Sequence, residues 1–193
     1  MSIPRTYVFV DGENLVMRYQ AMVADGFKPR KGVVHVPDVF VWHPGITTWD
    51  CVNIARAYYY TSATGDSQRI VELRKKIAGT LYSFSFERST FPVADGEAQL
   101  VPRIFHKSSQ SRKTRNVDIN IVIDVMRAGH LDNIDLIYLV SGDGDYMPLI
   151  EEVMRLGKEV NLSAFSSGLN EALVSSVDDF YSLDDVFFLR RGV

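Results

Sequence analysis

Cysteine is almost absent from this chain, since Cys51 is the only one among 193 residues. A lone cysteine excludes an intrachain disulfide and a cysteine-based zinc site. Long apolar runs are missing too, because no stretch approaches the roughly 18 residues that a membrane-spanning helix needs. The first six residues contain no apolar signal segment. These absences predict a cytoplasmic protein without a membrane anchor.

A strong excess of one charge is also missing. The chain has 21 Lys and Arg against 24 Asp and Glu, which gives a formal net charge of -3 and a pI near 5.8. This balance excludes a strongly basic nucleic-acid-binding protein but leaves room for a local basic patch. Hydrophobic residues make up 46% of the chain, which is enough for a sizeable core. The length fits one domain over residues 1–193.

Apolar segments that favour strands alternate with helical patterns along the chain. Residues 7–10, 54–62, 136–140 and 160–165 have the composition of strands, and helical spacing separates them. This alternation predicts an α/β fold with a central, largely parallel sheet. Residues 28–50 and 82–105 are predicted to be β-rich insertions. In the second of these, Asp95-Gly96 is the expected turn of a hairpin.

Two strands end in the same pattern, in which an acid and a glycine turn lead into a helix. Asp11-Gly12 follows the first strand, and Asp143-Gly144-Asp145 follows a later one. Sites in open α/β sheets form beyond the carboxyl ends of strands, so these acids lie where chemistry is expected. Helix capping is the alternative explanation. Asp145 is nearer its helix, and we expect it to combine capping with contact to the site.

A third acid, Asp118, lies in the first turn of a helix predicted over residues 116–129, where the helix dipole favours a carboxylate. Asp124 is six residues further on, about 120° around the helix axis, so the two acids do not share a face. The helix is apolar over most of its surface, which predicts burial. A buried charge needs a partner, so we expect Asp124 to have a salt-bridge or hydrogen-bond partner.

Adjacent strand ends in a parallel sheet would bring Asp11, Asp118 and Asp143 close together. Like charges at short range repel unless a cation joins them. Oxygen ligands with no cysteine and little histidine select Mg²⁺ or Mn²⁺, which can activate water for an in-line displacement at phosphorus. A basic segment precedes Asp118, and it would hold a polynucleotide backbone unless it is only a solvated surface loop. Its cations are Lys107, Arg112, Lys113 and Arg115.

Three motifs stand in order along the chain: Val10-Asp-Gly-Glu-Asn-Leu15, Lys113-Thr-Arg-Asn-Val-Asp118 with Asp124, and Val140-Ser-Gly-Asp-Gly-Asp-Tyr146. Together they resemble the NYN domain family of the PIN-like nuclease superfamily, and the likeness is closest to its LabA-like branch. The resemblance covers roughly residues 5–165. It implies a three-layer α/β/α sandwich with a metal-dependent ribonuclease site.

The resemblance also implies roles for single residues. It assigns Asp11, Asp118 and Asp143 as acids that bind Mg²⁺ or Mn²⁺, with Asp145 beside them as a further catalytic acid. Asn14 matches the position of a polar residue that orients the first acid or the substrate. RNA is the expected substrate and partner, and the aromatic-rich insertions make a homodimer one candidate assembly. We expect Asp124 and Ser141 to support the metal-binding acids without binding the ion themselves.

Other functions remain open at this point. The main alternative is a non-catalytic regulator on the same fold that binds RNA or a nucleotide, and binding unchanged by chelation would favour it. A phosphatase with Asp11 as its nucleophile is more distant, because Glu13 fits the required second acid only loosely. No G-x-G-x-x-G follows a strand, which disfavours a dinucleotide site. The run from Asp143 to Asp145 does not fit the EF-hand pattern.

Overall fold

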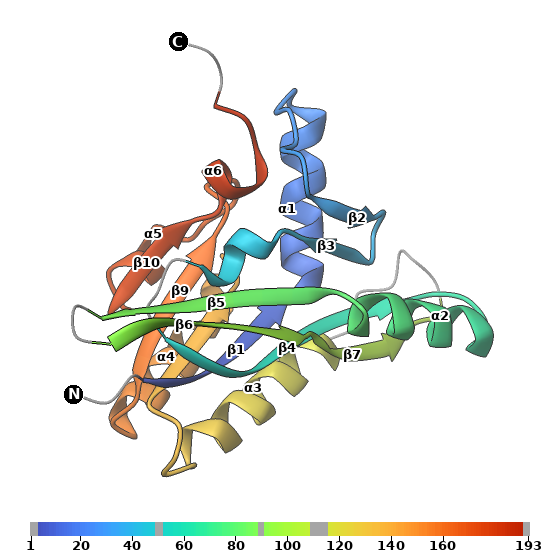
Figure 1. Ribbon diagram of the computed structural model, residues 1–193. Coiled ribbons are helices and arrows are strands. Elements are labelled where there is room, and N and C mark those ends of the chain that lie inside the picture. Colours follow the sequence, from blue (N-terminus) through green and yellow to red (C-terminus); the bar gives the residue numbers. More distant parts are fainter. Residues whose placement is uncertain (1–3, 49–51, 89–90, 109–115, 191–193) are drawn as a thin grey trace.

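The structure is a computed structural model that describes residues 4–48, 52–88, 91–108 and 116–190, with the backbone alone at 85–88 and 91–95. Within these ranges, six parallel strands form a central sheet in the order β10-β9-β8-β1-β4-β7 (Figure 1). The predicted α/β fold with a parallel sheet is confirmed. The strands are β1 (Arg5–Asp11), β4 (Asn53–Ala63), β7 (Val101–His106), β8 (Leu136–Val140), β9 (Glu159–Ala164) and β10 (Asp179–Ser182).

Helices cover both faces of the sheet and complete the three layers. On one face, α3 (Asn116–Gly129) and α4 (Met147–Arg155) pack over apolar side chains of β1, β8 and β9. On the other face, α1 (Gly12–Ala24) packs together with a β-hairpin, and α2 (Ser67–Ala78) packs against β7. A strand covered on both sides is apolar throughout, which explains the fully buried run of β8.

The other elements lie outside the central sheet. The hairpin of β2 (Val34–Val36) and β3 (Phe40–Trp42) lies in the first predicted insertion, and β5 (Leu81–Arg88) with β6 (Phe91–Gln99) lies in the second. The remaining elements are η1 (Pro44–Thr47), η2 (Gly144–Tyr146), α5 (Glu171–Val174) and α6 (Asp184–Phe187).

The turn predicted at Asp95-Gly96 is wrong. Both residues lie inside β6, where Gly96 pairs with Phe84 of β5. A side chain at Gly96 would begin 2.2 Å from the Phe84 ring. The glycine therefore marks a close approach within a strand, which is a known use of glycine in sheets. Residues 101–105 of the predicted insertion belong to β7 of the central sheet.

The predicted burial of α3 on all sides is also wrong. The face toward the sheet holds Val117, Ile121 and Val125, which are buried. The opposite face exposes three large apolar side chains, with Ile119 the most exposed at 51%. The helix belongs to an outer layer, so only one side of it can pack. Composition alone cannot tell a two-sided apolar helix from a buried one. The exposed residues are Ile119, Val122 and Ile123.

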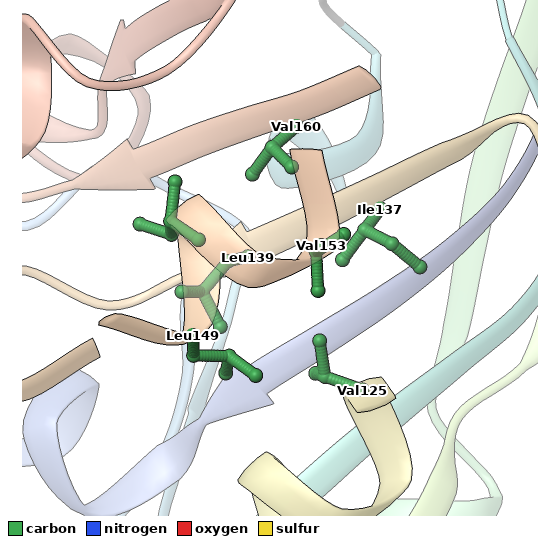
Figure 2. A pocket seen from close by; sticks show the side chains of 7 residues that line it. Val125, Ile137, Leu139, Leu149, Val153 and Val160 are labelled. Carbon is green, nitrogen blue, oxygen red and sulfur yellow. The ribbon is translucent and has the colours of Figure 1, made fainter. Parts of the chain in front are cut away.

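A small apolar cavity of about 10 Å³ lies between α3, α4 and the strands β8 and β9 (Figure 2). It holds no polar group that could orient a ligand, and an ordered water needs roughly this volume or more together with polar partners. It is therefore a gap in the core packing. Its lining residues are Val125, Ile137, Leu139, Leu149, Ile150, Val153 and Val160.

Across the described residues, no helix is both long and apolar enough to cross a bilayer.

The core beneath α4 gives a first prediction. Leu139 of β8 is 2% exposed and points toward the cavity in Figure 2. Leu139→Ala is expected to lower the free energy of unfolding by about 2–5 kcal/mol, because it enlarges a gap that already exists. Leu131→Ala, at an exposed position after α3, is the matched control and should cost less than about 1 kcal/mol. Urea unfolding of both variants tests this, and equal losses would contradict the assigned core.

Candidate acidic active site

The strand order reverses between β1 and β8. From β1 the sheet continues through β4 to β7 on one side, and through β8 to β10 on the other. Crevices beyond the carboxyl ends of strands at such a point are the usual ligand sites of open α/β sheets. Asp11 is the last residue of β1, and Asp143 follows β8 after two residues. Two of the predicted site acids therefore flank this crevice.

Asp11 is a buried acid whose oxygens accept several hydrogen bonds. It is 2% exposed. Its Oδ1 accepts from the backbone N–H of Asn14 at 3.0 Å. Its Oδ2 accepts from Ser141 Oγ at 3.1 Å and from Tyr146 Oη at 3.3 Å. The first contact caps α1, so the capping role considered for this position is present. The other two tie the end of β1 to the segment after β8.

Ser141 and Asn14 join the two strand ends. Ser141 Oγ also accepts from the backbone N–H of Asp143 at 3.2 Å, so one hydroxyl connects both acids. Asn14 Oδ1 accepts from the backbone N–H of Gly142 at 3.3 Å. The Asn14 side chain thus fixes the turn after β8 to the start of α1, while its backbone N–H orients Asp11. These bonds set the relative position of Asp11 and Asp143.

Gly12 allows α1 to begin this close to the sheet. A Cβ on Gly12 would lie 2.3 Å from the Tyr59 ring and 2.5 Å from the backbone oxygen of Tyr60. Real side chains do not tolerate such contacts, so the turn after Asp11 requires glycine.

Asp143 caps a short helix, and Asp145 does not. The N–H of Asp145 donates to Asp143 Oδ1 at 3.0 Å, at the start of η2. The expectation that the Asp145 side chain supplies the cap is therefore wrong, because Asp145 is the donor residue. Asp145 is exposed. Its charge still reaches the site, because it helps to raise the pKa of Asp118.

Asp118 lies in the first turn of α3, near enough to Glu13, Asp143 and Asp145 for their charges to act on it. Partial burial raises the pKa of Asp118, and the nearby charges of Glu13, Asp143 and Asp145 raise it further. The nearby hydroxyl of Tyr146 acts in the opposite direction and lowers this pKa. The acids from β1, β8 and α3 are therefore close enough to interact electrostatically.

Burial raises the pKa of Asp11 to about 7, and the charges of Asp118 and Glu13 add to this effect. The hydrogen bonds from Asn14 and Ser141 act against it. A buried carboxylate among like charges costs free energy when it is ionised. A cation placed between these acids would remove that cost.

The acids do not form a preformed metal cage. Within the described ranges, no three or more His, Cys, Asp or Glu side chains are grouped so that they could hold a metal ion. The carboxylates of Asp11 and Asp143 are instead directed to nearby N–H and O–H donors. The donor set nevertheless has the all-oxygen chemistry that Mg²⁺ and Mn²⁺ prefer. Mg²⁺ usually takes few carboxylates and keeps several waters, so these acids fit such an ion in their chemistry.

Lys107 lies beside the acids. Its Nζ is 3.6 Å from Glu13 Oε1, and its side chain is only 12% exposed. Ser62 Oγ of β4 donates to the same carboxylate oxygen. The interpretation of Lys107 as part of a solvated surface loop is therefore wrong. Arg112, Lys113 and Arg115, also predicted to bind substrate, lie outside the described residues.

Asp124 has the partners expected for a charge on a partly covered helix. Its Oδ2 accepts from Tyr60 Oη at 2.9 Å, and its Oδ1 lies 3.2 Å from Arg127 Nη1. Arg103 Nη2 is 3.7 Å from Oδ2. These contacts link α3 to β4 and β7. Asp124 therefore supports the site acids only indirectly, because it helps to fix the position of α3.

Two residues at the site were missed from the sequence. Tyr146 is buried with its hydroxyl on Asp11, and Glu13 places a fifth carboxylate near Asp118. A signal existed for Glu13, since it stands two residues after Asp11 in the first turn of α1. Tyr146 looked like an ordinary apolar position of a helix, because sequence spacing does not show where a hydroxyl points.

The raised pKa of Asp11 predicts how stability depends on pH. The folded protein holds this proton up to about pH 7, whereas an unfolded Asp loses it near pH 3.9. The protein therefore loses stability as pH rises through this window. The quantity to compare is the free energy of unfolding of wild type minus that of Asp11→Asn, measured with EDTA present. This difference should be about 2–3 kcal/mol larger at pH 5 than at pH 8. Urea unfolding at both pH values measures this, and a difference that stays constant or grows with pH would refute it.

Comparisons with known proteins agree with this architecture. A solved structure of a protein of unknown function from Vibrio parahaemolyticus superposes with a TM-score of 0.60 at 19% identity and covers 97% of both chains. At this identity the likeness shows the fold alone. A search of curated proteins found no match. The family model of the NYN domain matches residues 5–184. The chain therefore belongs to the NYN domain family.

Proposed function

We propose that the chain is a metal-dependent nuclease that hydrolyses RNA phosphodiester bonds, most simply as an endoribonuclease. The carrying observation is the convergence of Asp11, Asp118 and Asp143, with Glu13 and Asp145, on the point where the strand order reverses. Membership of the NYN family supports a PIN-like nuclease. The LabA-like branch and a cytoplasmic location belong to the same proposal, on the motifs and composition described above.

Asp11, Asp118 and Asp143 would hold Mg²⁺ or Mn²⁺. When bound, such an ion supplies Lewis acidity, which lowers the pKa of water and stabilises phosphate charge. Ser141 and Asn14 keep the two strand ends in register, and Tyr146 orients one oxygen of Asp11. Lys107 offers a cation for a substrate phosphate at the edge of the acids.

A regulator that binds RNA without cleaving it is the second candidate. The observation that favours it is the absence, among the described side chains, of a grouped set of three metal-binding residues. Both candidates predict RNA binding, so only turnover and its dependence on metal separate them.

Removal of one acid tests the nuclease directly. Asp143→Asn keeps the size of the side chain and an oxygen that can accept from Asp145, but it removes the charge. Cleavage of a single-stranded RNA in Mn²⁺ should fall by about 100-fold or more, because the ion supplies several kcal/mol of charge stabilisation. Asp132→Asn is the matched control, since Asp132 is exposed before β8 at the opposite edge of the sheet. Equal cleavage by wild type and Asp143→Asn that persists in EDTA would sink the nuclease and leave the regulator.

The Ser141 hydroxyl gives a more graded test. Ser141→Ala removes a donor to Asp11 and an acceptor for the N–H of Asp143, while both carboxylates remain. Such supporting residues typically change metal affinity or activity by about 10- to 100-fold. Mn²⁺ titration of the cleavage rate should show a higher metal requirement for Ser141→Ala, and Ser67→Ala is an exposed control in the first turn of α2. A maximal rate that drops with no change in metal requirement would speak against this role.

A further inference from the structure

One face of β7 remains partly open beside α3. Side chains alternate along a strand, so Arg103 and Phe105 lie on the same face of the sheet. In the parallel register they are next to Tyr60 and Ser62 of β4 on that face. Lys107 continues this alternation, because it meets the same Glu13 carboxylate as Ser62. The three side chains therefore form a row that ends at the acidic site. We name this row the β7 track.

Within the described part of the chain, the neighbouring elements leave Arg103 and part of Phe105 accessible. β7 is one of the two edge strands of the sheet, and α3 packs over β1, β4 and β8 (Figure 1). The helix α2 packs against β7 from the opposite face, where Ile104 joins its apolar side chains. The Arg103 side chain is 48% exposed, and Phe105 is only partly buried.

The contacts of Arg103 orient its guanidinium but leave some of its N–H donors available. Its guanidinium carbon lies 5.5 Å from the centre of the Tyr58 ring, and one nitrogen is 3.7 Å from Asp124. An exposed ion pair of this length is weak, and Asp124 is shared with Tyr60 and Arg127. A guanidinium has five N–H donors in a planar fork. Donors remain for a phosphate.

We propose that the β7 track of Arg103, Phe105 and Lys107 guides single-stranded RNA into the acidic site, and this rests on the proposed function. Arg103 is exposed and can hold a phosphate. The Lys107 side chain is only 12% exposed and pairs with Glu13, so it marks where the track meets the acids, roughly 13 Å from Arg103 along the strand. The ring of Phe105 lies between them, where an unpaired base can stack. Bases of a duplex are already stacked and paired, so the track discriminates against double-stranded RNA.

Binding measured in EDTA tests the track without cleavage. The probe is a fluorescently labelled 12-nucleotide RNA, single-stranded or annealed to its complement, followed by anisotropy at several KCl concentrations. Phe105→Leu keeps an apolar side chain but removes the ring, and it should weaken single-strand binding by about tenfold. Phe105→Tyr retains a ring and should bind as wild type does. Loss of affinity in both variants, or in neither, would overturn the stacking role.

Arg103 has a matched control in Arg127, because both pair with Asp124. Arg127 is 76% exposed and lies in the last turn of α3, at the far end from Asp118. Arg103→Gln should weaken binding and lower the slope of log Kd against log salt by about 0.7, the value for one phosphate contact on a single strand. Arg127→Gln should leave the slope unchanged. Equal effects of the two substitutions, or duplex bound as tightly as single strand, would overturn the track.

The track and the nuclease fail in different ways. If the Asp143→Asn variant cleaves RNA at the wild-type rate in EDTA, the nuclease proposal falls and the binding results still stand or fall by themselves. If cleavage depends on Asp143 and on metal while Arg103→Gln and Phe105→Leu bind and cleave single-stranded RNA normally, the nuclease stands and the track falls. Thermal unfolding of each variant confirms that the protein remains folded.

Discussion

The burial of the Asp11 carboxylate is the constraint on which the rest of the site depends. A carboxylate enclosed at the end of a central strand, with Glu13 and Asp118 nearby, is costly to ionise. The protein meets this cost in part with donors from Asn14, Ser141 and Tyr146. Those donors come from α1 and from the segment after β8, so the same bonds that support the acid also hold the two strand ends together.

The topology explains why a site forms there. The reversal of strand order separates the helices that follow β1 and β8 onto opposite faces of the sheet, as α1 and α4 show. The turns after these strands can then diverge. Glycines at 12, 142 and 144 place no side chain in these turns, where neighbouring atoms lie close. Asp118 comes from α3, which packs over β1 and β8. The site is thus assembled from three segments that the fold brings to one edge.

The sequence was sufficient for the sheet and for the acids at its edge, because both leave a local pattern. A buried strand followed by an acid, a glycine and a helix is visible without any partner, as at Asp11 and Asp143. The contact of Tyr146 with Asp11 and the pairing of Lys107 with Glu13 were not visible, since they join segments that are distant in the sequence. The prediction that the outer face of α3 is buried was wrong for a related reason. Its apolar residues predict burial, but whether a second layer covers them is decided by the whole fold.

The charge pattern ties these features to a function. Acids gather at the crevice between β1 and β8. Arg103 of β7 and Lys107 just after it lie on the other side of β1 from β8, which leads to Asp143. Such a separation suits a phosphodiester held by cations and attacked beside a metal ion.

The most direct test is a crystal soaked in Mn²⁺ and measured for anomalous scattering. We expect one ion bound by Asp11 and Asp143, with Asp118 reaching it through water. An ion bound elsewhere, or no ion at saturating Mn²⁺, would contradict a metal-dependent active site at this crevice.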